Sequence, residues 1–134
     1  SQRATLSGAV IVTTPQDIAL LDARKGIEMF QKVEVPVLGL IENMAAHVCT
    51  ACGQVEPLFG EAGGQHLAKQ YDVSLLGQIP LDRAIREHSD QGHPIVLADP
   101  KGPIAMVYQE AALKLMAALG QQRPAPAPII SMGD

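Results

Sequence analysis

The chain has 134 residues, of which 47% are hydrophobic, and its formal net charge at pH 7 is -4. This length is that of one domain that can bury a core without disulfide or metal staples. The negative charge, with no Lys/Arg cluster to offset it, argues against a nucleic-acid surface, and no apolar run approaches the roughly 20 residues that span a bilayer. Because a basic-then-apolar leader pattern is also missing, we expect a cytoplasmic protein without nucleic-acid or membrane partners.

Three short apolar runs, at 8–14, 37–41 and 74–79, are continuous rather than alternating. Strands that are buried on both faces of a parallel sheet have this pattern. Helical patterns separate the runs. This order predicts a three-layer α/β fold over residues 1–119, in which a parallel sheet forms the middle layer and helices flank it. A first strand this apolar is typical of the middle of a wider sheet, so we expect the chain to be a truncated half of a larger fold.

The first helix is predicted between the first two apolar runs. Thr14 can cap it, Pro15 suits the first helical position, and Asp17 stands where a capping box places an acid. An apolar stripe at helical spacing follows, formed by Ala19, Leu20, Ala23, Ile27 and Phe30. The strand, this helix and the second strand then form a βαβ unit, whose crossover is almost always right-handed.

Three further helices are expected downstream. One covers about 61–70, a short one follows Asp82, and the last runs over 102–119 with Gly120 as its stop. The stretch 120–134 is rich in Pro and Ala, and we expect it to be a disordered tail. The charged residues of the short helix form a solvated face, made of Arg83, Arg86 and Glu87.

The only two cysteines, Cys49 and Cys52, form a Cys-x-x-Cys motif followed by Gly53. A tight turn of this kind directs two sulfurs at one point, and glycine lets the backbone turn back without a Cβ clash. We place the motif in a loop over about 44–60. Closed zinc and iron–sulfur sites use four protein ligands, and one chain offers only two cysteines. Two chains related by a two-fold axis would together supply four thiolates.

The residues alone leave three interpretations of the cysteine pair open. One is a metal or cluster site shared between chains, and another is a pair of incidental thiols. The third is a redox pair, although the residues after Cys52 do not begin a helix whose N-terminus could lower the thiol pKa. Histidine could supply further ligands: His47 and His66 are the nearest along the chain, and His88 and His93 are remote.

Phosphate binding is not supported by any loop of the chain. No G-x-x-x-x-G-K-[ST] sequence is present, and the glycine-rich stretch "FGEAGGQHLA" lacks the Lys and Ser/Thr that grip phosphates and a metal ion. We therefore interpret this stretch as the entry to a helix.

Five segments together carry a resemblance to a known family. They are "SGAVIVTTPQDIALLDARKGIEMF", "VPVLGLIENM", "CTACG" with "LFGEAGG", "LLGQIPLD" and "REHSDQGHPIV". In this order and spacing the chain resembles, over about 1–119, the C-terminal half of the Mrp/ApbC-type iron–sulfur cluster carrier ATPases. These belong to the deviant Walker A class of P-loop NTPases, with MinD and ParA. The cysteine pair stands where the carriers have it and where MinD and ParA do not.

The resemblance implies a site and a function. Cys49 and Cys52 would bind a [4Fe-4S] cluster bridged between the subunits of a homodimer, which passes the cluster to recipient apoproteins. Asn43 and the turn that runs from Pro80 to Asp82 would lie at the adenine side of an ATP site. On the residues alone, Asn43 is a strand-end cap and Pro80 an ordinary turn residue. The resemblance also places Gln16 near the partner subunit's nucleotide.

The sequence departs from the family pattern in two respects. Relatives often have an aromatic residue just before the cysteine pair, where this chain has Ala45, Ala46 and His47. The family's phosphate-binding loop and acidic switch segments would lie upstream of Ser1, so we expect ATP and Mg²⁺ binding in the parent protein and no catalysis by this chain alone. The alternatives are a zinc-binding interaction module, with His47 as a third ligand, and a fragment of a MinD/ParA-like positioning ATPase.

Overall fold

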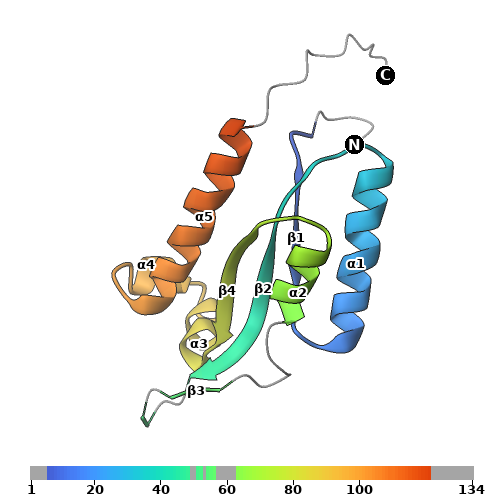
Figure 1. The fold of residues 1–134 in the computed structure, drawn as a ribbon. Helices are drawn as coiled ribbons and strands as arrows, with labels where there is room; N and C mark the ends of the chain where they lie inside the picture. Colours follow the sequence, from blue (N-terminus) through green and yellow to red (C-terminus); the bar gives the residue numbers. More distant parts are fainter. Residues whose placement is uncertain (1–5, 49–50, 53, 57–62, 122–134) are drawn as a thin grey trace.

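A computed structural model describes residues 6–48, 51–52, 54–56 and 63–121. Strands and helices alternate along most of the chain, as Figure 1 shows. In chain order the elements are β1 (Ala9–Thr13), α1 (Asp17–Lys32), β2 (Val37–Val48), β3 (Val55–Glu56), α2 (Gly63–Gln70), β4 (Leu75–Leu81), α3 (Arg83–Asp90), α4 (Ile95–Ala98) and α5 (Pro103–Gln121).

The sheet is built around β2, which pairs in parallel with β1 on one side and with β4 on the other. Near the end of β2, the short strand β3 pairs with it in antiparallel, with His47 opposite Glu56. Helices lie on both faces: α1 packs on β1 and α2 on β2, while α5 packs on β4 and β2 (Figure 1). The predicted α/β fold, a parallel sheet of three strands with flanking helices, is confirmed.

The core lies between the sheet and the pair α1 and α2. Leu40, at the centre of β2, and Ile27 of α1 are completely buried, and Ala23, Leu67 and Ala68 complete the cluster. The apolar stripe predicted for the first helix therefore packs inward at Ala23 and Ile27. Burial of these apolar side chains supplies most of the favourable free energy that holds α1 and α2 on the sheet.

The start of the first helix differs from the prediction. Gln16 is the N-cap, since its backbone is extended and its carbonyl oxygen accepts the first helical hydrogen bond from the Leu20 N–H. Thr14 does not cap the helix, because its hydroxyl lies 3.2 Å from Oε1 of Gln16. Pro15 precedes the helix instead of occupying its first position. The helix therefore begins two residues later than the capping signals indicated.

Two further boundaries differ. The second strand was expected to end at 41, but β2 continues to Val48, so the first part of the predicted loop over 44–60, residues 44–48, is strand. The extension is bent: Met44 has a left-handed backbone with φ 54°, and the pairing with β4 shifts register between Asn43 and His47. Gly120 does not stop the last helix, which runs through it to Gln121. The short helix α4 was not predicted.

The strand β1 is less buried than expected. Within the described sheet it lies at an edge, with β2 as its neighbour, and the Val12 side chain is 63% exposed. The prediction that all three strands are buried on both faces is therefore wrong for β1 in this chain. None of the helices in the described part of the chain is both long and apolar enough to cross a membrane.

Candidate functional site

The carboxyl ends of β1, β2 and β4 meet at one edge of the sheet. Because open parallel sheets bind ligands outside these ends, this edge is the natural place for a site. Asn43 lies on β2 directly opposite Ile79 of β4, and Pro80 follows Ile79. The structure therefore brings two of the predicted nucleotide residues, Asn43 and Pro80, to neighbouring strands at the expected edge.

Asn43 has a defined structural contact. Its Oδ1 accepts a hydrogen bond of 2.9 Å from the backbone N–H of Met44. This bond supports the left-handed conformation of Met44, which costs free energy for a residue other than glycine. Among the described residues, the Asn43 amide NH₂ group has no hydrogen-bond partner, so it can still donate to an acceptor on a ligand.

Asp82 caps a helix, a role that we did not predict for it. It is the N-cap of α3, and its Oδ1 accepts a hydrogen bond of 2.8 Å from the backbone N–H of Ala84. The cap satisfies one of the free N–H groups at the start of the helix. The carboxylate is thus already engaged in holding α3, directly after the Pro80 turn.

Replacing Asp82 by Ala is expected to destabilise the protein by about 1 kcal/mol, because the N-cap bond is lost. Asp82→Asn, which keeps an acceptor oxygen, is expected to lose only a small part of this. The matched control is Asp90→Ala on the same helix, since Asp90 makes only an exposed pair with Arg86, worth about 0.5 kcal/mol or less. Urea unfolding measures the difference; equal losses in Asp82→Ala and Asp90→Ala would contradict the capping role.

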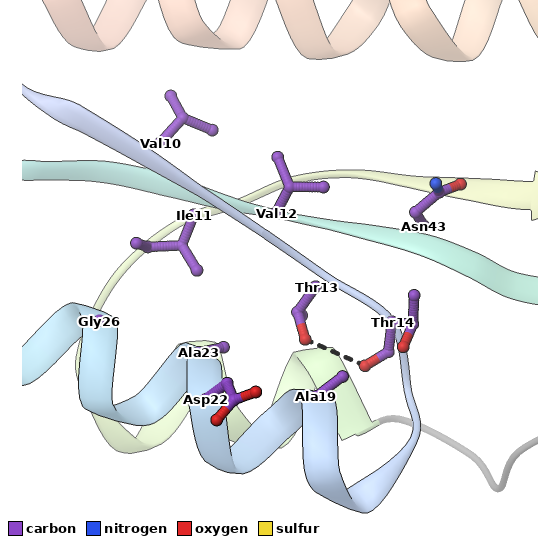
Figure 2. Close-up of a pocket in the computed structure, with 10 residues that line it drawn as sticks. All are labelled: Val10, Ile11, Val12, Thr13, Thr14, Ala19, Asp22, Ala23, Gly26 and Asn43. Carbon is purple, nitrogen blue, oxygen red and sulfur yellow. Dashed lines mark hydrogen bonds between the residues drawn. The ribbon is translucent and has the colours of Figure 1, made fainter.

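A groove of about 460 Å³ runs beside β1. Figure 2 shows that Val10, Val12 and Asn43 point to the α5 side of the sheet, while Ile11 and Thr13 point toward α1. The lining of the groove contains one charged residue, Asp22, which would repel a phosphate. The groove is therefore a poor phosphate site. It is lined by Val10, Ile11, Val12, Thr13, Thr14, Ala19, Asp22, Ala23, Gly26 and Asn43.

The cysteine motif lies on the connection between β2 and β3. Val48 pairs with Val55, so the residues between them join two paired strands at the far end of β2. Cys52 is a free cysteine and is exposed. Cys49 and the side chain of His47 lie outside the described residues. The exposed thiol of Cys52 is accessible to a metal and to a second protein chain.

In the described part of the chain, no three His, Cys, Asp or Glu side chains lie together as a metal site requires. His66, the other nearby histidine considered as a ligand, is exposed on α2. His88 and His93 belong to α3 and the turn after it.

A buried carboxylate, Glu42, was not singled out from the sequence. It is only 2% exposed; its Oε2 accepts a 2.8 Å hydrogen bond from the Gly64 N–H and its Oε1 a 2.9 Å bond from Gln78 Nε2. Acidic side chains are almost never fully buried without partners. The available signal was the position of Glu42 itself, directly after the apolar run of β2.

Comparisons with known proteins give a consistent result. The ParA family profile, described as NUBPL iron-transfer P-loop NTPase, matches residues 1–116. A protein named iron-sulfur cluster carrier protein, from Pseudomonas fragi, is 58% identical over 113 residues, which are 84% of this chain and 39% of that protein. The iron-sulfur cluster transfer protein NUBPL of Mus musculus is 48% identical over 116 residues, 87% of this chain and 36% of that protein.

The fold comparison agrees with the family comparison. The solved structure of the septum site-determining protein MinD complexed with Mg-ADP, from Pyrococcus horikoshii, superposes with a TM-score of 0.63 at 25% identity. The match covers 89% of this chain and 45% of that chain. The chain thus spans less than half the length of these similar proteins.

Proposed function

The chain belongs to the NUBPL iron-transfer P-loop NTPase family, and we propose that it carries a [4Fe-4S] cluster bridged between two copies and passes it to recipient apoproteins. The membership confirms the family resemblance of the sequence. One observation carries the proposal: Cys52 of the Cys-x-x-Cys motif is an exposed free cysteine in a chain of an iron-transfer family. Two such chains together supply the four thiolates that a cubane cluster needs.

The chemistry of transfer follows from this ligand set. A cluster held by two thiolates from each of two chains can be released by exchange, in which each recipient thiolate replaces one carrier thiolate and the leaving sulfur takes up a proton. The iron and sulfide pass on unchanged, so no oxidant or reductant is consumed. An exposed Cys52 admits the incoming thiolate, which a closed four-cysteine cage would resist. The reducing cytoplasm would keep these thiols free.

Nucleotide binding would belong to the whole protein. In this proposal Asn43 and Pro80 contribute the adenine side, with the free Asn43 amide donating to a ring nitrogen and Pro80 giving an apolar edge. Asp82 would act there by holding α3 rather than by contacting the base. The phosphate and Mg²⁺ contacts would come from the remaining part of a longer protein, in which ATP binding biases the dimer geometry.

The test is reconstitution followed by transfer. The chain is incubated anaerobically with ferric iron, sulfide and excess dithiothreitol, which reduces part of the iron. It is then freed of excess iron and mixed with an apo-ferredoxin. The proposal predicts that visible cluster absorbance appears on the chain and then moves to the ferredoxin, while a mock sample without the chain transfers nothing. Tight uptake of zinc by a monomer, without any cluster, would instead support an interaction module and contradict the proposal.

A further inference from the structure

We infer that Glu42 is a positioning residue for the cysteine-bearing segment between β2 and α2. This inference rests on the proposed function, since it concerns how the two thiolates are placed. Glu42 and Asn43 are consecutive residues of β2, so their side chains point to opposite faces of the sheet. Glu42 contacts the helix that follows the segment, and Asn43 contacts the part of β2 that precedes it.

The far end of the segment is held by Glu42. The carboxylate accepts the Gly64 N–H at 2.8 Å, and Gly64 belongs to the first turn of α2, which begins directly after the segment. The second carboxylate oxygen accepts from Gln78 Nε2 of β4 at 2.9 Å. Because the carboxylate is buried, water does not compete for these bonds, and a bond to a charged acceptor is about twice as strong as a neutral one.

The contact between Gly64 and Glu42 is close. A Cβ on Gly64 would lie 2.9 Å from Cδ and from Oε2 of Glu42, which is closer than real contacts allow. A Cβ on the neighbouring Gly63 would lie 2.9 Å from Cδ1 of Leu20 in α1. The first turn of α2 is therefore packed closely between β2 on one side and α1 on the other, and an added Cβ at either glycine would displace a neighbouring side chain.

Asn43 makes its contact within β2, before the segment begins. Its Oδ1 bonds the N–H of Met44, the left-handed residue at which β2 bends. One contact before the cysteine-bearing segment and one after it thus come from two adjacent side chains of one strand. Since a cluster shared between chains needs both thiolates of each chain at the right place, loss of the Glu42 anchor is expected to loosen the cluster without removing a ligand.

The experiment compares two substitutions of similar size. Glu42→Gln keeps an acceptor for the Gly64 N–H, and its NH₂ group can donate to Gln78 once that amide turns over. Glu42→Leu fills the same volume but accepts no hydrogen bond. After reconstitution, we expect Glu42→Leu to lose its cluster to an iron chelator about tenfold faster than the unsubstituted chain. We expect Glu42→Gln to lose it close to the original rate, a rescue that packing alone does not explain.

A substitution on the other side of the contact gives an independent test. Gly64→Ala should displace the carboxylate and speed cluster loss as Glu42→Leu does. The matched control is Gly120→Ala, where an added Cβ meets nothing within 4 Å, and its rate should not change. If circular dichroism shows that Glu42→Leu does not fold, the rate of cluster loss from Gly64→Ala tests the inference instead.

One measurement needs no cluster. Hydrogen exchange at the Gly64 amide should be at least about tenfold faster in Glu42→Leu than in the unsubstituted chain, because the amide loses its acceptor. Unchanged exchange, or cluster loss at the original rate in folded Glu42→Leu and Gly64→Ala, would overturn the inference. If the unsubstituted chain takes up no cluster at all, the proposed function fails instead, and the exchange measurement still decides on the anchor.

Discussion

Replacing Cys49 or Cys52 by Ser is expected to abolish cluster binding, leaving less than about one tenth of the iron that the unsubstituted chain retains. In a shared site each substitution removes two ligands, because both copies of the chain carry it, and only two of the four thiolates remain. The serine hydroxyl is not ionised near neutral pH and is a poor ligand for iron. Iron and acid-labile sulfide are measured after anaerobic reconstitution and desalting.

His66→Ala is the control for this prediction, since His66 is an exposed potential ligand on α2 and should leave the iron content unchanged. His47→Ala separates the cluster from the zinc alternative: retention of iron supports two ligands per chain, whereas loss of bound metal supports a third ligand. Full iron retention in either cysteine variant would contradict the assignment of the pair.

Replacing Leu40 by Ala is expected to destabilise the protein by about 2–5 kcal/mol, which is a large part of the stability of a domain this size. Leu40 is completely buried at the centre of the sheet and packs with the core of α1 and α2. Its removal costs the transfer free energy of the side chain and leaves a cavity that rigid strands on both sides cannot close.

The matched control is Leu113→Ala on α5, where the leucine is 66% exposed and the change should stay within about 0.5 kcal/mol. Urea unfolding gives the change in the free energy of unfolding for both variants, provided that this free energy depends on urea concentration with the same slope in each. Similar losses for Leu40→Ala and Leu113→Ala would show that the core is not where the structure places it.

The elements of the fold could be predicted because their signals are local. Continuous apolar runs identified β1, β2 and β4, and the apolar stripe identified the inner face of α1. The length of β2 could not be predicted, because residues 42–48 include polar side chains and a left-handed Met44 that interrupt the strand pattern. The exposed Val12 could not be predicted either, since a sequence does not show which strand lies at an edge.

The candidate site was predictable only in part. Family resemblance pointed to Asn43, Pro80 and Asp82, and the structure brings the first two to one edge of the sheet. The capping bond of Asp82 is also local and could have been read from its position before α3. The partner of Glu42 is 22 residues away in the chain, so no periodicity or spacing rule could reveal that contact.

The mass of the reconstituted protein tests the central claim most directly. Native mass spectrometry under anaerobic conditions measures the number of chains, iron atoms and sulfides in one particle. The account predicts one [4Fe-4S] cluster on two chains, and monomeric chains once the cluster is chelated away. A cluster bound to a single chain, or two chains that persist without any iron between them, would contradict it.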